Sequence, residues 1–301
     1  VPVHPDLDTR RTIQAKLVQK EALVDAGIPV PEFVAIATAD GLERVVEEYD
    51  GVMLKAREGG YDGRGNVPVQ DPDDAADALN EIGGAAMAEE LLDFEREIAV
   101  MGLKGADGEV RTYPVTETIH REEILRESVA PARTDDAIVA EAESVARDVL
   151  GVLDGRGVFG IELFETRDGE VLVNEIAPRP HNSGHWTIEG ARTSQFENHV
   201  RAVLGWPLGP TDLVAPSVTA NVLGDVDETE PATLRHVEEV FAAPDADFHW
   251  YGKDDVRPLR KMGHLTATER DPDSPNDGET DRDALLSRAR ELRDVLTFRD
   301  A

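Results

Sequence analysis

The segment 157–177 constrains the fold more than any other part of the sequence. It reads GVFGIELFETRDGEVLVNEIA, so two apolar runs flank the pair Asp168-Gly169. An Asp-Gly pair between two such runs is a strong signal for a β-hairpin whose turn has two residues. We therefore predict two antiparallel strands that pair with each other.

The turn decides which side chains face each other. With Asp168-Gly169 in the turn, Arg167 pairs with Glu170, and counting outward from that pair places Glu162 directly across from Glu175. Opposite side chains on a sheet lie about 5 Å apart. The predicted hairpin thus brings two carboxylates together.

The predicted face around the two glutamates is largely apolar, with the neighbours Gly160, Phe164, Val173 and Ala177. Like charges directly opposite each other repel, and more strongly where water is excluded. A shared proton would relieve this repulsion. Two carboxylates beside the amide of Asn174 also suit Mg²⁺, which takes oxygen ligands together with substrate phosphates. A hairpin whose acidic residues simply face water is the third interpretation.

Composition sets the class of protein. The chain has 301 residues, 40% of them hydrophobic, and its length predicts a folded protein of about two domains. It has no Cys, and its 62 acidic and 31 basic residues give a formal net charge of −31. So negative a chain repels phosphate backbones and anionic headgroups, so we expect neither a nucleic acid nor a membrane as partner. With no long apolar run and no basic leader, a cytoplasmic protein is the default expectation.

Lysine is scarce in this chain. Only six of the 31 basic residues are Lys, the rest are Arg, and the acidic excess is spread along the whole chain. A dispersed acidic surface suits a cytoplasm rich in salt, where a short Debye length screens the self-repulsion. We interpret the charge as adaptation to a halophilic cell, with an ordinary acidic enzyme as the alternative.

Hydrophobic periodicity and turn residues predict the order of elements. Helices are expected at 8–27, with Asp8 as N-cap and Gly27 as stop signal, and at 41–49, 72–82, 135–153, 194–204 and in a last segment ending near 296. Extended segments are expected at 29–37, 52–55, 85–91, 95–102 and 110–116, and a loop at 269–283. In the helix 135–153 the apolar residues recur at helical spacing: Ile138, Ala142, Val145, Val149 and Val152.

A glycine-rich segment follows the strand predicted at 52–55. Its sequence, KAREGGYDGRGN at 55–66, holds four glycines, with Lys55 before them and Arg64 among them. Glycine lets backbone amides approach phosphate oxygens, and the two basic side chains would supply charge. The pattern matches neither a P-loop nor a dinucleotide-binding fingerprint. Phosphate binding and a simple Gly-rich turn are both open interpretations.

Two further clusters are rich in polar side chains. The loop after the hairpin contains Arg179, His181, Asn182, Ser183, His185 and Trp186, which indicates a ligand-lined loop. The segment 249–264 gathers Lys253, Arg257, Arg260, Lys261 and His264 in an otherwise acidic chain. Such a positive island favours an anionic ligand such as a phosphate, and ion pairing with Asp254 and Asp255 is the alternative.

Three strings carry a resemblance to a known family: GGYDGRG, NEIAPRPHNSGHWTIEGARTSQFENHVRA and HWYGKDDVRPLRKMGH. They closely resemble the 5-(carboxyamino)imidazole ribonucleotide synthase family of the ATP-grasp superfamily, the ATPase subunit of phosphoribosylaminoimidazole carboxylase, in its halophilic archaeal type. The resemblance implies an α+β, ATP-grasp fold in which two α/β subdomains clamp ATP. It places a linker helix and the first subdomain, the lid, at 1–92, the second subdomain with the Mg-ATP site at 93–214, and a small C-terminal domain at 215–301.

The resemblance implies a ligase of de novo purine (IMP) biosynthesis with ATP and Mg²⁺ as cofactors. Bicarbonate would attack the γ-phosphate of ATP to give carboxyphosphate, which delivers CO₂ to the exocyclic amine of 5-aminoimidazole ribonucleotide. Another ATP-grasp carboxylate or formyl ligase, and an inactive or partner-dependent ATP-binding fragment, are the alternatives. Because carboxyphosphate hydrolyses, closure of a loop over the site would be part of the chemistry.

Residue roles follow from the same resemblance. It implies nucleotide contacts for Lys16, Lys55, Gly60, Tyr61, Asp62, Gly63, Arg64, Gly65, Asn66, Glu89, Glu90, Leu91, Leu92, Glu97, His120, Asn174 and Glu175. It implies Mg²⁺ ligation by Glu162 and Glu175 and substrate contacts for Tyr61, Arg179, His181, Asn182, Lys253 and Lys261. The implied catalytic residues are Asp62, which would orient or deprotonate the amine, Arg64, and Lys261, which would stabilise negative charge.

The family normally begins with a further α/β domain, and this chain opens at what would be the linker after it. That domain usually supports the substrate side of the cleft and carries the dimer contact, so the resemblance also implies a homodimer. We therefore expect a chain that lacks this domain, as a fragment, through a misassigned start, or as one half of a split protein.

Overall fold

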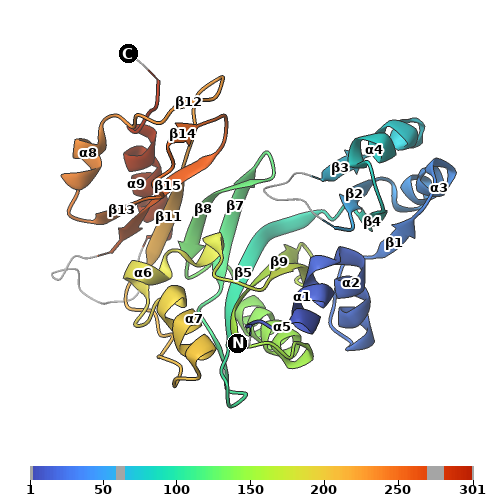
Figure 1. The fold of residues 1–301 in the computed structure, drawn as a ribbon, viewed down its shortest axis with the longest axis horizontal. Helices are drawn as coiled ribbons and strands as arrows, with labels where there is room; N and C mark the ends of the chain where they lie inside the picture. The colour runs from blue at the N-terminus through green and yellow to red at the C-terminus, as the bar shows by residue number, and fades with distance from the viewer. Residues whose placement is uncertain (1–2, 59–64, 270–280, 300–301) are drawn as a thin grey trace.

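The computed structural model describes residues 3–58, 65–269 and 281–299, and two antiparallel sheets dominate it (Figure 1). A small sheet with its helices lies at one end of the molecule, and the C-terminal strands with helix α9 (Arg282–Asp294) lie at the other. Strands of the large sheet run between them. Within the described residues, no helix is long and apolar enough to cross a membrane.

The small sheet has four strands in the order β1 (Phe33–Ile36), β4 (Ala86–Glu90), β2 (Val52–Ala56) and β3 (Asn66–Val69). Helices α3 (Ala39–Tyr49) and α4 (Ala75–Ile82), the latter preceded by a 3₁₀ turn at Pro72–Asp74, belong to its apolar core. Leu42 of α3 and Leu54 of β2 are fully buried there. Thr38 begins α3 by accepting a hydrogen bond from the backbone of Gly41, a typical N-cap.

The large sheet has nine strands among the described residues, in the order β10 (Val171–Ala177), β9 (Gly157–Thr166), β5 (Phe94–Lys104), β7 (Thr116–Arg121), β8 (Ile124–Ala130), β11 (Ser217–Leu223), β15 (Lys261–Thr268) and β13 (Ala246–Trp250), with β6 (Val110–Thr112) beside β5. Ser217 pairs with Ala130 where β11 joins β8. The C-terminal strands therefore continue the same sheet that holds the glutamate hairpin. A separate two-stranded ladder joins β12 (Glu230–Pro231) to β14 (Asp255–Val256).

Helices cover this sheet. The predicted stripe of α5 (Asp136–Val152) is confirmed, because Ile138, Ala142, Val145 and Val149 are buried in one core cluster with side chains of β5, β9 and β10. Helix α7 (Gln195–Leu204) begins at the N-cap Ser194 and contributes to a second cluster around Trp186. The short helices are η2 (Asn182–Gly184), α6 (Thr187–Gly190) and α8 (Val237–Phe241).

The prediction of one helix over 8–27, capped at Asp8, is wrong. Two helices are present, α1 (Leu7–Gln14), capped by Asp6, and α2 (Lys16–Asp25), and the chain between them is extended at Ala15. The backbone N–H of Lys16 donates to the carbonyl of Arg57 at 2.9 Å, so a tertiary contact replaces a helical one. Gly27, in the left-handed conformation with φ +73°, follows α2 as the predicted stop signal.

The other predicted helices and strands are confirmed within a few residues, with three exceptions. The strand expected at 110–116 is two separate strands, β6 and β7, because the chain leaves β6 at Thr112 to pair with β5 again from Thr116. The expectation did not include β8, nor the C-terminal strands β11 to β15. The loop expected at 269–283 ends in helix α9 from Arg282, and its residues 270–280 lie outside the described part.

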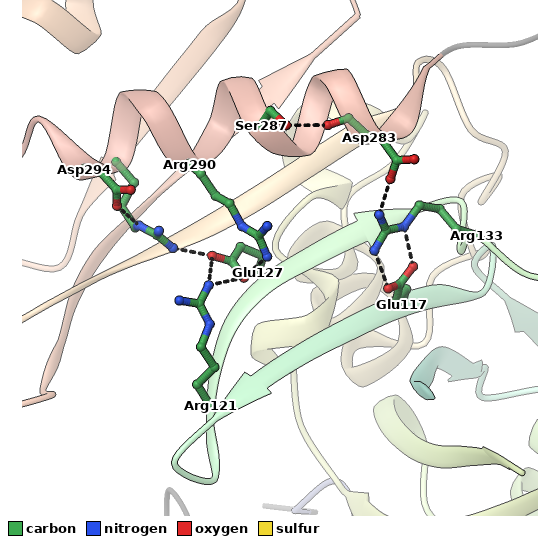
Figure 2. A network of polar contacts seen from close by, with 9 residues as sticks. Glu117, Arg121, Glu127, Arg133, Asp283, Ser287, Arg290 and Asp294 are labelled. Atoms are coloured by element: carbon green, nitrogen blue, oxygen red, sulfur yellow. Dashed lines mark hydrogen bonds and ion pairs between the residues drawn. The ribbon is translucent and has the colours of Figure 1, made fainter. Parts of the chain in front are cut away.

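Ionic contacts hold α9 against the sheet (Figure 2). The carboxylate of Glu127, fully buried on β8, contacts Arg121 at 3.0 Å, Arg290 at 3.1 Å and also Arg293. Burial opposes its ionisation, but hydrogen bonds from the α9 arginines outweigh that effect and lower the pKa of Glu127. A second bridge runs through Arg133, which binds Glu117 of β7 and Asp283 of α9. The last helix is thereby anchored to β7 and β8.

Candidate active site

A cavity of about 310 Å³ lies where the small sheet faces the large one. Strands of both sheets, helix α2 and the loop after β10 supply its walls. Most predicted site residues line it: Lys16, Lys55, Asn66, Glu89, Glu90, Leu91, Leu92, Glu97, His120, Glu162, Asn174, Glu175, Arg179, His181, Asn182 and Lys261. Its size falls in the range of small-molecule sites.

Some predicted residues are not in this lining. Gly60, Tyr61, Asp62, Gly63 and Arg64 lie outside the described residues. Gly65 and Lys253 are described but do not line the cavity. Phe164, predicted on the same face as the glutamates, lines the cavity. Sequence reasoning in turn missed five lining residues: Pro31, Met53, Phe94, Glu123 and Leu125. Most of these are apolar, and the sequence does not distinguish an apolar wall from ordinary core.

The hairpin brings Glu162 and Glu175 opposite each other, as predicted, but its register differs near the turn. The loop has three residues, 167–169, with Gly169 at φ +83°, and not the predicted two. A β-bulge at Asn174 then shifts the register back by one residue. The predicted pairing of Arg167 with Glu170 is therefore wrong, because Glu170 pairs with Thr166.

The bulge also changes which side chains share a face with Glu162 and Glu175, so the predicted set of neighbours is partly wrong. Val173 does not lie beside the carboxylates but is fully buried in the core cluster under α5. Asn174 and Glu175, although adjacent in sequence, both line the cavity. The surroundings of Glu162 are more polar than expected: its nearest charged neighbours include His120, Glu97 and Lys261.

The glutamate pair carries unbalanced negative charge. Burial, and after it the facing charge of Glu175, together raise the pKa of Glu162 to about 7. Glu175 in turn binds Lys16, whose Nζ lies 3.1 Å from Oε2. In the described part of the chain, no cluster of three or more metal-ligating side chains is found. Two hard carboxylates whose repulsion already favours a bound cation fit Mg²⁺, which commonly takes one or two protein carboxylates plus phosphate oxygens.

A buried charge cluster joins two lining residues, Lys55 and Glu89, to Lys20, which does not line the cavity. Glu89 of β4, only 2% exposed, binds Lys20 at 3.1 Å and also Lys55. Lys55 donates in addition to Oδ1 of Asn174, and Lys20 to the carbonyl of Val173, at 2.8 Å. Lys20 was not among the predicted site residues, since a lysine on a helix gives no local signal of burial. Desolvation lowers the pKa of Lys20 to about 8, against the opposing pull of Glu89.

A second acid–base contact faces the cavity from the large sheet. His120 Nδ1 lies 3.1 Å from Glu97 Oε2. Burial opposes protonation of His120, but Glu97 and then Glu162 outweigh this effect and raise its pKa above the usual value. This edge of the cavity therefore pairs an imidazole with a carboxylate that favours its protonated form.

The loop after β10 is held close to the glutamates. A Cβ at Gly160 would lie 2.6 Å from the Cβ of His181, so only glycine permits this approach. Gln195 fixes the loop through two hydrogen bonds to the backbone of His181. Its side chain accepts from the N–H at 2.9 Å and donates to the carbonyl at 2.7 Å. Burial, with the charge of Arg179, lowers the pKa of His181 to about 3, so the ring is neutral. Ser183 and Trp186 from the same motif are fully buried and support the loop from below.

Only Lys261 of the predicted basic island lines the cavity. Lys253 donates to the backbone carbonyl of Lys261, and its Nζ lies 5.5 Å from the centroid of the Tyr251 ring. Arg260 donates to the carbonyl of Asp255 at 2.7 Å, and Arg257 is exposed. Lys253 thus contacts the strand that presents Lys261.

Comparisons with known proteins agree with this architecture. A model of the ATP-grasp domain matches residues 21–196, and one of the phosphoribosylaminoimidazole carboxylase C-terminal domain matches residues 217–276. The N5-carboxyaminoimidazole ribonucleotide synthase of Mycobacterium tuberculosis is 43% identical over 260 residues, which cover 84% of this chain and 60% of that protein. The Synechocystis protein of that name is 38% identical, with 91% and 72% covered.

Solved structures give the same result. N5-carboxyaminoimidazole ribonucleotide synthetase from Thermotoga maritima superposes with a TM-score of 0.83 at 40% identity, covering 98% of this chain and 74% of that one. The synthase from Aspergillus clavatus in complex with ADP and 5-aminoimidazole ribonucleotide gives 0.86 at 34% identity, covering 98% and 77%.

The two facing sheets, the cavity between them and the matched domain model define an ATP-grasp protein. Its C-terminal region and its relatives narrow this class. The chain belongs to the N5-carboxyaminoimidazole ribonucleotide synthase family. It spans 60% of the length of the mycobacterial relative.

The buried cluster generates a prediction about pH. The unfolded chain keeps the Lys20 proton up to a pKa near 10.5, whereas the folded protein loses it near 8. Between these values the unfolded state binds more protons, so stability rises with pH, by up to about 1.4 kcal/mol per unit. We expect the free energy of unfolding of the wild type to rise relative to that of Lys20→Met from pH 8 to 10.5, measured by urea titration.

Lys20→Arg is the matched control, since its guanidinium keeps its proton throughout this range. Both variants should lack the rise. A wild type that runs parallel to both variants would contradict the assignment.

Proposed function

We propose that the protein is a ligase that uses ATP and bicarbonate to carboxylate the exocyclic amine of 5-aminoimidazole ribonucleotide, in purine (IMP) biosynthesis. The products are 5-carboxyaminoimidazole ribonucleotide, ADP and phosphate. The observation that carries the proposal is that one cavity holds two groups of side chains. The first group is suited to a nucleotide and consists of Lys16, Lys55 and the glutamate pair. The second group consists of Arg179, His181, Asn182 and Lys261. The relative from Aspergillus clavatus was solved with ADP and 5-aminoimidazole ribonucleotide.

The proposed chemistry has two steps. An oxygen of bicarbonate attacks the γ-phosphorus, the bond to the β,γ-bridging oxygen breaks, and ADP leaves with that electron pair. The carboxyphosphate so formed releases phosphate and CO₂, and the amine nitrogen attacks the carbon and loses a proton. Asp62 is the proposed acceptor of that proton, and Lys261 stabilises the negative charge that develops.

The nucleotide contacts are proposed from the geometry of the lining. Lys55 and Lys16 already bind Asn174 and Glu175, so both ammonium groups sit at the edge of the glutamate pair. They would hold the phosphates there. The segment 89–92 between the two sheets would meet the adenine through its backbone, and Glu97, positioned by His120, would accept from the ribose hydroxyls. By the family resemblance, residues 60–66 are proposed to close over the nucleotide.

Glu162 and Glu175 are the proposed ligands of Mg²⁺. The ion would supply charge neutralisation for the phosphates of ATP when bound. The division into units at 1–92, 93–214 and 215–301, and a homodimer, stay predictions.

The decisive test is phosphate release. We expect release from ATP in the presence of Mg²⁺ and bicarbonate to increase when 5-aminoimidazole ribonucleotide is added, at high KCl. Release that does not respond to the ribonucleotide would indicate another ATP-grasp ligase. Absence of any release, with ATP still bound, would indicate a nucleotide-binding fragment and would contradict the proposal.

The metal assignment has its own test. Glu175→Gln removes one of two anionic ligands, so we expect Mg²⁺-ATP to bind about 10- to 100-fold more weakly in calorimetry while the circular dichroism spectrum is unchanged. Glu170→Gln, on an exposed residue of the same hairpin, is the matched control and should bind normally. Unaltered binding to Glu175→Gln would show that the ion is held elsewhere.

We also propose that the protein works in a salt-rich cytoplasm. None of the six lysines is exposed: Lys20 and Lys55 are buried, and Lys16, Lys104, Lys253 and Lys261 are half-buried. The surface therefore presents carboxylates and arginines with no fully exposed ammonium group. Five of them bind carboxylates or carbonyls through their ammonium groups: Lys16, Lys20, Lys55, Lys104 and Lys253.

Salt dependence checks this proposal. Raising KCl from 0.1 to 1 M shortens the Debye length from about 10 Å to about 3 Å, which weakens repulsion among the surface carboxylates. We expect the thermal unfolding midpoint to rise over this range, and to rise more than that of the Bacillus subtilis relative. A midpoint that stays constant or falls would count against a halophilic origin.

A further inference from the structure

Asn182 lies where the cavity meets the C-terminal strands. It begins η2, directly after His181, and lines the cavity. Its amide faces that of Asn221, a residue in β11 that is only 2% exposed. The two amides bond reciprocally: Asn182 Nδ2 donates to Asn221 Oδ1 at 3.1 Å, and Asn221 Nδ2 donates to Asn182 Oδ1 at 3.0 Å.

A backbone carbonyl settles the direction of both bonds. Asn221 Nδ2 also donates to the carbonyl oxygen of Leu125, at 2.9 Å. A carbonyl can only accept, so the nitrogen of Asn221 must point at Leu125. That nitrogen is also the atom facing Asn182, and the Asn182 atom opposite it must therefore be the oxygen. The hydrogen-bond network thus assigns both amides, which geometry alone would leave ambiguous.

His185 accepts a hydrogen bond from the second N–H group of the Asn182 amide. Its Nδ1 lies 3.1 Å from Asn182 Nδ2 and 3.2 Å from the hydroxyl of Tyr251. Because Asn182 Nδ2 can only donate, His185 Nδ1 is the acceptor of this bond. Burial, followed by the charge of Lys261, lowers the pKa of His185 to about 4, which keeps the ring neutral.

A layer of aromatic and imidazole rings holds His185 in place. Its ring centroid lies 4.4 Å from that of His264, and the hydroxyl of Tyr251 lies 2.9 Å from His264 Nδ1. His264 stands directly opposite Asn221 on the paired strand β15, and His249 stands opposite His264 on β13. Asn182 is therefore fixed by Asn221 of the C-terminal strand β11 and by His185 of its own loop, which in turn packs against His264 of β15.

The hydrogen bonds that the Asn182 side chain already makes restrict the further hydrogen bonds open to it. Both of its N–H groups are used, on Asn221 and His185, and its Oδ1 accepts one bond from Asn221. An amide oxygen can accept two. Within the described contacts, the capacity left over is one acceptor position. An anionic oxygen of phosphate or bicarbonate cannot use it, whereas an amine or a hydroxyl can.

We propose that Asn182 accepts a hydrogen bond from an N–H or O–H group of the ribonucleotide, and that Asn221 and His185 are positioning residues that hold its amide in this orientation. This inference rests on the proposed function. It adds the direction of one contact, in which the ribonucleotide donates and Asn182 accepts. Asn221 of β11 thereby selects for a donor on the substrate although it does not itself line the cavity.

The test separates the two substrates by steady-state kinetics. Asn221→Leu removes both hydrogen bonds between Asn221 and Asn182 and so loosens the orientation of the Asn182 amide. We expect KM for 5-aminoimidazole ribonucleotide to rise about tenfold, which corresponds to about 1.4 kcal/mol, while KM for ATP changes less than about twofold. His185→Phe keeps an aromatic ring and removes only the acceptor, so it tests the same proposal should Asn221→Leu fail to fold.

Thr219→Val is the matched control. Thr219 lies two residues from Asn221 on β11, is equally buried, and bonds Thr266 at 3.1 Å. Its loss removes one buried hydrogen bond from the same strand, so a merely structural effect would appear here as well. We expect both KM values to be unchanged.

A double-mutant cycle tests whether Asn221 acts through Asn182. We expect Asn182→Ala to raise KM for the ribonucleotide, and Asn221→Leu to add nothing in that background. Additive effects, equal changes in KM for ATP, or an unchanged KM for the ribonucleotide in both Asn221→Leu and His185→Phe would overturn the inference. A wild type without ribonucleotide-stimulated phosphate release would instead overturn the proposed function, and this inference with it.

The donor can be identified by competition. An imidazole ribonucleotide that lacks the exocyclic amine keeps the hydroxyls. If its inhibition constant is insensitive to Asn221→Leu, Asn182 accepts from the amine. If the constant rises as KM does, Asn182 accepts from a hydroxyl. Either result supports the acceptor role.

Discussion

The β-bulge at Asn174 is the constraint on which the rest of the cavity depends. Neighbours in a regular strand face opposite sides, so Asn174 and Glu175 could not both point into the cavity without it. The bulge leaves Val173 in the core under α5 and presents the two polar side chains together. Asn174 then binds Lys55 of the small sheet, and Glu175 binds Lys16 of α2. One extra residue in a hairpin thus joins the three parts of the chain that enclose the cavity.

Charge balance explains the arrangement around that hairpin. A buried charge without a partner costs several kcal/mol, so each buried ammonium or carboxylate is expected to find one. Glu89 lies between Lys20 and Lys55, and Glu97 pairs with His120. Glu162 is the exception, because burial and Glu175 outweigh the cations near it and raise its pKa to about 7. The site therefore carries an excess of negative charge at the place where a divalent cation would remove it.

The predicted hairpin places Glu162 opposite Glu175 correctly because two errors in its predicted register cancel. The sequence predicts a two-residue turn, whereas the loop has three residues, which moves every pairing near it by one position. The bulge at Asn174 moves the pairing back before Glu175 is reached. The conclusion survived, but the predicted neighbour Val173 was on the wrong face. The partner of the bulged residue Asn174 is Lys55, 119 residues away along the chain, so the local sequence does not reveal the contact that the bulge makes possible.

The sequence by itself determined what neighbouring residues decide: the stripe of α5, the cap at Ser194, the stop at Gly27, the existence of the hairpin, and the motifs that identify the family. Tertiary structure decided the break at Ala15, the burial of Lys20 against Glu89, the continuation of the large sheet from β8 to β11, and the direction of the Asn182 amide. Periodicity and capping act within a few residues and can be read along the chain. Burial and strand pairing depend on partners tens of residues away, and only the folded chain brings those together.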